Sequence, residues 1–201
     1  MMDRRTLVSA LWWQERYRDR GGRVRGVLLI AGVTIVFSAL LLLSLRSLGA
    51  QSPLRALAIV WLPMAWLGTV SHVVGMQLTS GYHRLRQFEV DGRCYERLGV
   101  RLFKRLLRRG PFALFNPGLH LPPDRSADEL AKLEQRMRTA ETTHFVLLVA
   151  TLPVVGDALA RGAWAAAGYT FALDVLVNGY PVMLQRYNRA LLRQRFGHLV
   201  G

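Results

Sequence analysis

Long hydrophobic runs separated by basic segments dominate the chain. The first run, residues 27–49, holds no charged residue between Val27 and Leu45, which is about the length that crosses a hydrocarbon core of roughly 30 Å. Three further runs are hydrophobic over most of their length: 54–79, 144–160 and 162–184. We therefore predict an all-α fold, a four-helix transmembrane bundle that forms a single membrane domain over residues 1–201.

Basic segments lie at both ends of these runs. Residues 1–26 place Leu7, Leu11 and Trp12 at helical spacing ahead of several arginines, as in a helix that lies in the headgroup region. Residues 185–201 form a basic tail without an acidic residue. The first segment is therefore predicted to be an interfacial leader.

Residues 80–143 are the one long polar region, and we predict that they are cytoplasmic or interfacial. Within them, residues 93–109 form a clear helical wheel. Its apolar side is made of Tyr95, Leu98, Leu102, Phe103, Leu106 and Leu107, and its basic side of Arg97, Arg101, Lys104, Arg105 and Arg108. This pattern fits a helix on the membrane surface, whose cations either anchor to anionic lipid or also collect an acidic donor.

A proline-rich stretch, residues 111–123, follows this wheel. It is too rich in proline for a helix and too apolar for an ordinary loop. We expect it to cover a pocket, with Asn116 and His120 as polar contacts. Ser126 and Glu129 then have the spacing of a capping box, so a long helix is predicted to start there and to enter the bilayer near His144.

The distribution of charge predicts the orientation. The formal net charge is +14 although 51% of the residues are hydrophobic, and the arginines flank the apolar runs, so nucleic acid is not expected as a partner. Lys and Arg number seven in residues 1–26, thirteen in 80–143 and four in 185–201, against three in the two short turns on the other side. The positive-inside rule then places both termini in the cytoplasm.

Glu141 and His144 are the first candidates for chemistry, because residues three apart share one face of a helix. A carboxylate beside an imidazole holds its tautomer, which suits His144 as the general base for an attacking hydroxyl. A structural pair at the start of the membrane span is the alternative. A zinc site would need His120 as a third ligand, since Cys94 is the only cysteine.

A polar stripe runs along the last hydrophobic segment. Its members recur at helical spacing: Thr170, Asp174, Asn178, Pro181 and Gln185, continued by Arg189. Carboxylates and amides are costly within a membrane, so the stripe is expected to face the bundle interior or a polar cavity. It then either forms hydrogen bonds between helices or lines a substrate site.

If the third and fourth spans pair in antiparallel fashion, His144 lies near the level of Gln185. Asn178 and Gln185 would then hold a hydroxyl substrate within reach of His144. Guanidinium groups suit bidentate contacts with phosphate or carboxylate. The cations expected to hold the phosphates of the donor, or its carrier protein, are Arg186, Arg189 and Lys104.

Several short motifs between residues 84 and 193 recur in one family of small bacterial membrane proteins. They are Phe88-Glu89, Ala140-Glu141 with His144, Leu152-Pro153, Asn178, Pro181, the run Gln185-Arg186-Tyr187-Asn188-Arg189, and Leu192. In these positions the chain resembles the glycosyl-4,4'-diaponeurosporenoate acyltransferases. The resemblance makes these residues site candidates: Glu141, His144, Asn178, Gln185, Arg186, Asn188 and Arg189.

In that family a fatty acyl group is placed on the sugar of a glycosylated carotenoid, in the synthesis of staphyloxanthin-type pigments. The resemblance implies a multi-pass acyltransferase of the bacterial inner membrane, with no cofactor beyond acyl-CoA or acyl-carrier protein as the acyl thioester donor. A carotenoid glycoside, another glycolipid or a lipid alcohol are open as acceptors. The alternatives are a non-catalytic membrane subunit or lipid-binding protein, and a metal-dependent membrane hydrolase built on Glu141, His144 and His120.

Overall fold

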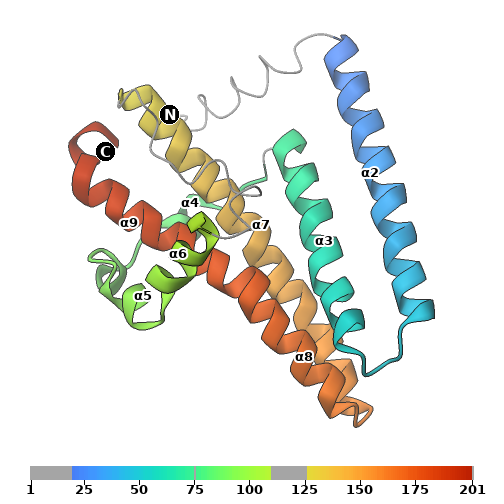
Figure 1. Ribbon diagram of the computed structural model, residues 1–201. Helices are drawn as coiled ribbons and strands as arrows, with labels where there is room; N and C mark the ends of the chain where they lie inside the picture. Colours follow the sequence, from blue (N-terminus) through green and yellow to red (C-terminus); the bar gives the residue numbers. More distant parts are fainter. Residues whose placement is uncertain (1–19, 75, 110–125, 201) are drawn as a thin grey trace. The chain divides into compact units, whose positions relative to one another are not determined.

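The computed structural model describes residues 20–74, 76–109 and 126–200 (Figure 1). These residues form helices and their connections, with no strand among them, so the all-α prediction is confirmed. The predicted leader falls mostly on residues 1–19, and the predicted pocket cover with Asn116 and His120 falls on residues 110–125. Both lie outside the described residues.

Two compact units make up the fold. The first contains Met1–Met76 and Val146–Val175, and the second contains Gln77–Phe145 and Leu176–Gly201. One long helix, α7 (Ala127–Ala160), contributes residues to both units. It begins directly after Ser126 and carries Asp128 and Glu129 in its first turn, where acidic groups offset the helix dipole, so the predicted long helix is confirmed.

The first unit contains a helical hairpin made of α2 (Arg20–Ser47) and α3 (Pro53–Val74) (Figure 1). Trp66 Nε1 on α3 donates a hydrogen bond to Thr34 Oγ1 on α2 at 2.9 Å. Helix α8 (Trp164–Asp174) packs against α3. The small side chains of α8 permit this close approach, because without water present helices associate mainly through packing.

The turn between α2 and α3 is closed by side chains. Arg55 Nη1 donates to the carbonyl groups of Leu45 at 3.0 Å and Leu48 at 3.2 Å. The first carbonyl belongs to the last turn of α2 and the second to the residue after that helix, where no further turn provides a donor. Ser52 Oγ accepts from the backbone N–H of Leu54 at 3.2 Å and so caps the start of α3.

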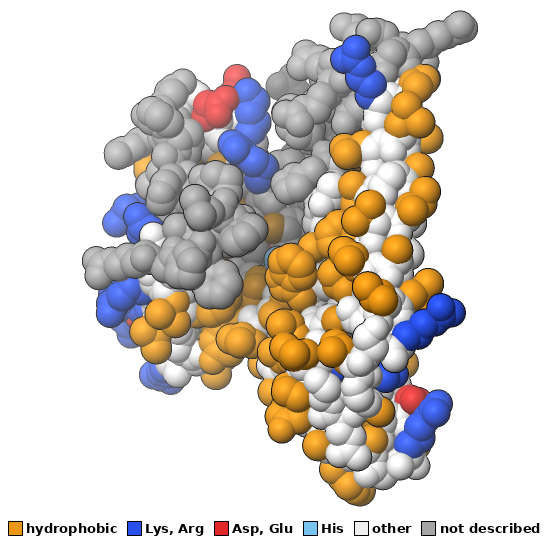
Figure 2. Space-filling model, turned by 45° about the vertical axis from the view of Figure 1, so that its right-hand side comes forward, with side chains coloured by type: hydrophobic (Ala, Val, Ile, Leu, Met, Phe, Trp, Pro, Cys, Tyr) orange, Lys and Arg blue, Asp and Glu red, His pale blue; other side chains and the backbone are white. Residues whose placement is uncertain are grey.

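Three of the described helical segments are long and apolar enough to cross a membrane: Val24–Ser47, Pro53–Ser71 and Ala127–Ala160. Large hydrophobic side chains of α2 are exposed: Val27, Leu28, Leu29, Ile35, Val36, Leu40, Leu42 and Leu43. Figure 2 shows such side chains spread over the surface of the long helices. A surface of this kind requires lipid around it, and it identifies a membrane protein.

The predicted fourth span, residues 162–184, is helical from Trp164 onward but is divided. It consists of α8, a π-helix, η4 (Val175–Gly179), and the start of α9 (Tyr180–Val200). The wider turn of a π-helix shifts the register of the side chains that follow. The arrangement of four spans with both termini in the cytoplasm remains a prediction.

The second unit combines the lower-numbered part of α7 with α9 and four short helices. These are α4 (Ser80–His83), the 3-10 helix η1 (Gln87–Glu89), α5 (Arg93–Arg97) and α6 (Val100–Arg109). Two small hydrophobic clusters hold it together. Tyr95, Val100, Leu184 and Tyr187 form the first, and Leu130, Leu133 and Leu192 form the second.

The predicted helix over residues 93–109 is interrupted at Gly99, whose φ is +77°, a value that favours glycine. The apolar side chains of residues 93–109 divide into two groups, one packed inside the unit and one exposed. Phe103 and Leu107 pack against the cluster around Leu184 and Tyr187, whereas Leu98, Leu102 and Leu106 are exposed: their exposed fractions are 55%, 59% and 59%. Exposed leucines beside arginines are consistent with the predicted interfacial location.

Gly92 offers a test of how the second unit is packed. Its φ is +71°, and a Cβ atom there would lie 3.0 Å from two carbons of the Tyr187 ring. We expect Gly92→Ala to lower the free energy of unfolding by about 2 kcal/mol or more, because backbone strain and overpacking act together. Thermal denaturation in detergent measures the effect.

Gly99→Ala is the matched control, since Gly99 also has positive φ but nothing lies within 4 Å of the position that its Cβ would take. It should therefore lose only the backbone contribution, about 1 kcal/mol. Equal losses in both variants would contradict the close contact between Gly92 and Tyr187.

Candidate functional site

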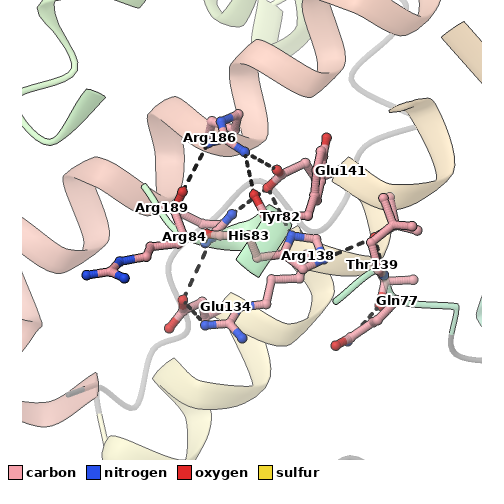
Figure 3. Close-up of polar contacts among 12 residues, drawn as sticks. Gln77, Tyr82, His83, Arg84, Glu134, Arg138, Thr139, Glu141, Arg186 and Arg189 are labelled. Atoms are coloured by element: carbon pink, nitrogen blue, oxygen red, sulfur yellow. Dashed lines mark hydrogen bonds and ion pairs between the residues drawn. The ribbon is translucent and has the colours of Figure 1, made fainter. Parts of the chain in front are cut away.

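Two charged stripes of opposite sign meet in the second unit. Glu134 and Glu141 lie seven residues apart on α7, and therefore on one helix face, while Arg186, Arg189 and Arg193 lie on one face of α9. Glu141 and Arg189 are fully buried. Figure 3 shows ion pairs that join the two helices. We call these five side chains, together with Glu89 and His83, the ionic cluster.

Arg186 is the most highly connected side chain of the ionic cluster. It makes a bidentate contact with Glu89, with Nε 2.7 Å from Oε1 and Nη2 2.8 Å from Oε2. Its Nη1 donates to Glu141 Oε1 at 2.7 Å. It also donates to the carbonyl groups of Tyr82 at 3.2 Å and Arg84 at 3.3 Å, so every N–H group of the guanidinium has an acceptor within the fold.

Arg189 completes the neutralisation of Glu141. Its Nη1 donates to Glu141 Oε2, and its Nη2 donates to the carbonyl group of His83. Its Nε lies 3.7 Å from Glu134 Oε1, and the same oxygen accepts from Arg193 Nη2 at 3.0 Å. Burying charges costs several kcal/mol per ion unless partners and hydrogen bonds compensate, and this arrangement provides both.

The contacts of Arg186 and Arg189 lie within the fold, and their predicted role toward the donor stays a prediction. The sequence predicted that both guanidinium groups hold a phosphate of the donor. In the structure, carboxylates of the chain and backbone carbonyl groups occupy them instead. They fasten α9 to α7 and to the segment that contains α4 and η1.

Glu141 also has a different histidine partner from the predicted one. His83 Nδ1 lies 3.5 Å from Glu141 Oε2, and the other ring nitrogen lies 3.2 Å from Thr142 Oγ1. Thr142 Oγ1 in turn accepts the backbone N–H of Leu78 at 3.2 Å. His83 is 2% exposed, so this chain of contacts connects α4 to α7 away from solvent.

The electrostatics of Glu89 follow from the same contacts. Burial raises its pKa, but hydrogen bonds from Arg186, from the backbone N–H of Arg86 and from Tyr95 outweigh burial and lower the pKa from 4.5 to about 2. Burial raises the pKa of Tyr95, and its hydrogen bond to Glu89 raises that pKa further. Glu89 is therefore an ionised acceptor at neutral pH and Tyr95 a neutral donor.

His144 and Asn178 come together, although they belong to different helices. His144 Nδ1 lies 3.1 Å from Asn178 Oδ1. Asn178 is fully buried and lies in the π-helix η4, whereas His144 is half-buried. π-turns within helices are frequent at functional sites, and a ring nitrogen fixed by an amide oxygen gives the imidazole a defined orientation.

The predicted polar stripe is buried along its first part. Thr170, Asp174 and Asn178 are each at most 3% exposed. Beyond the π-helix, Gln185 is only half-buried, and its side chain makes no hydrogen bond within the described part of the chain. The sequence placed His144 near the level of Gln185, whereas the amide that His144 contacts is that of Asn178.

Lys104 and Asn188 form a second contact between a helix and α9. Lys104 Nζ donates to Asn188 Oδ1 at 2.6 Å and lies 5.5 Å from the centroid of the Tyr187 ring. Asn188 is buried, and Lys104 is half-buried. Tyr187 Oη donates to Glu96 at 2.8 Å, which holds the ring in place.

No role was predicted from the sequence for several residues in or beside the ionic cluster: Tyr82, His83, Glu89, Glu134, Arg138 and Thr142. The charge stripes were a usable signal, because Glu134 and Glu141 recur at heptad spacing and α9 carries three arginines on one face. No pattern in the sequence pointed to His83, because His83 is far from Glu141 in the sequence and comes close to it only in the folded protein.

The zinc alternative depends on His120, which lies outside the described residues. Within residues 20–74, 76–109 and 126–200, no group of three or more His, Cys, Asp or Glu side chains is placed to hold a metal ion. Glu141 and His144 have separate partners there: two arginines and His83 for the first, and Asn178 and the backbone of Val177 for the second.

Comparison with known proteins links this region to one family. The family profile described as CrtO, glycosyl-4,4'-diaponeurosporenoate acyltransferase, matches residues 79–197. This match covers more than half of the chain, including the ionic cluster and the contacts of His144 and Lys104. No curated protein and no solved structure matches the chain.

The ionic cluster predicts a large effect of neutralising Glu141. We expect Glu141→Gln to lower the free energy of unfolding by about 3 kcal/mol or more, because Arg186 and Arg189 lose their shared counter-charge inside the fold. Asp157→Asn removes an exposed ion pair with Arg161 and should change stability by less than about 0.5 kcal/mol. Denaturation in detergent compares the two, and similar losses would contradict a structural role of Glu141.

Glu89 predicts a pH dependence of stability. The pKa of Glu89 in the folded protein, about 2, lies below the ordinary value of 4.5. The contribution of Glu89 to the free energy of unfolding is therefore complete above about pH 5 and is lost as pH falls from 4.5 towards 2. We expect thermal stability of the wild type to fall more steeply below pH 4.5 than that of Glu89→Gln. Asp91→Asn, which alters an exposed pair with Arg93, should keep the wild-type slope.

Proposed function

The chain belongs to the glycosyl-4,4'-diaponeurosporenoate acyltransferase family, and from this premise we propose that it transfers a fatty acyl group to a sugar hydroxyl of a glycosylated carotenoid or a related membrane glycolipid. The donor is an acyl thioester, either acyl-CoA or acyl-carrier protein. The proposal places the reaction at the cytoplasmic face of a bacterial inner membrane, because the basic segments mark that face.

The contact between His144 and Asn178 is the observation that supports this function best. If Asn178 Oδ1 accepts the proton on Nδ1 across the 3.1 Å contact, the other ring nitrogen, Nε2, carries the lone pair. A neutral imidazole fixed in this tautomer is suited to remove a proton from a hydroxyl group. His144 is half-buried, whereas His83 is 2% exposed, with Nδ1 3.5 Å from Glu141 Oε2 and Nε2 3.2 Å from Thr142 Oγ1.

The proposed reaction is a direct acyl transfer. His144 Nε2 takes the proton of the acceptor hydroxyl while the oxygen of that hydroxyl forms a bond to the thioester carbonyl carbon. The bond between that carbon and sulfur then breaks, and the thiolate leaves and takes up the proton from the imidazolium. Gln185, whose half-buried amide is not engaged within the described residues, is assigned to position the acceptor or the developing oxyanion.

The ionic cluster has a positioning role in this proposal. Glu141 lies on α7 one helical turn before His144, and Arg186 lies on α9 beyond Asn178. The ion pair between Glu141 and Arg186, 2.7 Å long, ties α7, which carries His144, to the helix that follows Asn178. A catalytic geometry depends on such support, because small displacements of a base reduce the rate strongly.

A non-catalytic subunit is the competing function, and one observation favours it. Much of the motif that characterises the family, including Arg186, Tyr187 and Arg189, serves the interior of the fold. Its presence is therefore compatible with a structural or lipid-binding protein. Such a protein would make no acylated product with any acyl thioester.

Lipid analysis of cells that make the glycosylated acceptor tests the proposed function. With the wild-type protein, mass spectrometry should find a product heavier than the acceptor by one fatty acyl group. His144→Ala should reduce its formation about 10²- to 10⁴-fold, the usual contribution of a general base. Asn178→Ala should give a smaller loss, because the base remains but its orientation does not.

Asp157→Asn serves as the activity control, since it alters only an exposed ion pair. All variants are compared at equal amounts of folded protein, judged by melting temperature in detergent. Undiminished product formation by folded His144→Ala would overturn the role of this histidine. Absence of any acylated product with the wild type would favour the non-catalytic alternative.

A further inference from the structure

Lys104 is held by neutral groups, whereas the arginines between α7 and α9 have carboxylate partners. Its Nζ donates to Asn188 Oδ1 at 2.6 Å and faces the Tyr187 ring at 5.5 Å. The arginines that pair with glutamate side chains are Arg138, Arg186, Arg189 and Arg193. Lys104 makes no ion pair among the described residues.

Two further cations act on Lys104 at this contact. Burial lowers the pKa of Lys104, and Arg108 and Arg195 lower it further through repulsion. Arg108 belongs to the same helix, α6, and Arg195 to α9. Neither of the two exposed arginines has an ion-pair partner within the described part of the chain. Arg108 follows Lys104 by one turn of α6, and Arg195 follows Asn188 by two turns of α9, so each lies on the same side of its helix as the contact.

The electrostatic free energy of these three cations is unfavourable without a counter-ion and becomes favourable when an anion binds among them. Like charges at short range raise the electrostatic free energy, and an anion placed among them removes that cost. The ammonium group has three donors, of which Asn188 uses one. Guanidinium groups supply paired donors that match phosphate oxygens. The side chain of Asn188 also carries an amide N–H group, which is a neutral donor.

We propose that Lys104, Asn188, Arg108 and Arg195 form a binding site for a phosphate group. The assignment of this phosphate to the acyl donor, as in the diphosphate of an acyl-CoA, rests on the proposed function. A phosphate of a lipid headgroup has the same chemistry and is the other source. Arg186 and Arg189, which the sequence analysis expected to serve this purpose, are already neutralised by Glu89 and Glu141.

Binding of CoA to the purified protein in maltoside micelles, which contain no phosphate, tests the proposal. Isothermal titration should show binding of CoA, and none of pantetheine, which lacks phosphate. Lys104→Met and Asn188→Asp should each weaken CoA binding by about tenfold or more, since charge-assisted hydrogen bonds to phosphate are lost. Lys132→Met is the matched control, because Lys132 is the other lysine of the chain and pairs with Glu129.

Asn188→Asp separates binding from folding. The new carboxylate has nearly the shape of the amide and provides Lys104 with an internal counter-ion, so the melting temperature should be equal to or above that of the wild type. CoA binding should nevertheless weaken by about tenfold or more, because the new carboxylate neutralises Lys104 and repels the phosphate. A merely structural contact between Lys104 and Asn188 would leave CoA binding unchanged.

Adding phosphatidylglycerol to the micelles distinguishes the two sources of phosphate. Binding of this lipid, but not of CoA, that depends on Lys104 would support the site and identify a headgroup as its ligand. If neither ligand depends on Lys104 and Asn188, the proposal is overturned. His144→Ala should keep the affinity for CoA while losing acyl transfer, so failure of the phosphate site and failure of the proposed function give different results.

Discussion

Glu141 is a fully buried carboxylate, and the second unit is built so that its charge is matched. Two guanidinium groups of α9 neutralise it, and His83 approaches it from α4. Because an unmatched charge in such a place would cost several kcal/mol, these partners must be present together. The requirement fixes α7, α9 and the segment from α4 to η1 in one arrangement, although the hydrophobic clusters of this unit are small.

This constraint separates the members of one short motif by role. In the run Gln185-Arg186-Tyr187-Asn188-Arg189, the two arginines satisfy buried carboxylates, and Tyr187 belongs to the hydrophobic cluster and bonds to Glu96. Asn188 accepts a hydrogen bond from Lys104, and Gln185 is half-buried. Most side chains of this run therefore fix α9 within the fold, and only some of them are available to contact a ligand.

The contact between His144 and Asn178 benefits from the same framework. Glu141 precedes His144 by one turn of α7, and Asn178 lies in the π-helix directly before α9. Any change in how α9 is tied to α7 would move the amide relative to the imidazole. The ionic cluster and the proposed catalytic pair are thus mechanically connected.

Local pattern was sufficient to predict the long helices, because hydrophobic periodicity, caps and charge at helix ends act over a few residues. It identified α2, α3 and the start of α7, but it placed His144 near the level of Gln185 and did not predict its contact with Asn178. It could not show that Arg186 and Arg189 are neutralised within the fold or that Arg189 is fully buried, since the sequence does not reveal whether the partner of a cation is a ligand or a glutamate. Nor could it pair Glu141 with His83 or show the π-helix at Asn178. Those features depend on which helices pack together. That choice depends on the free energy of burying each charge, which is determined only in the folded protein.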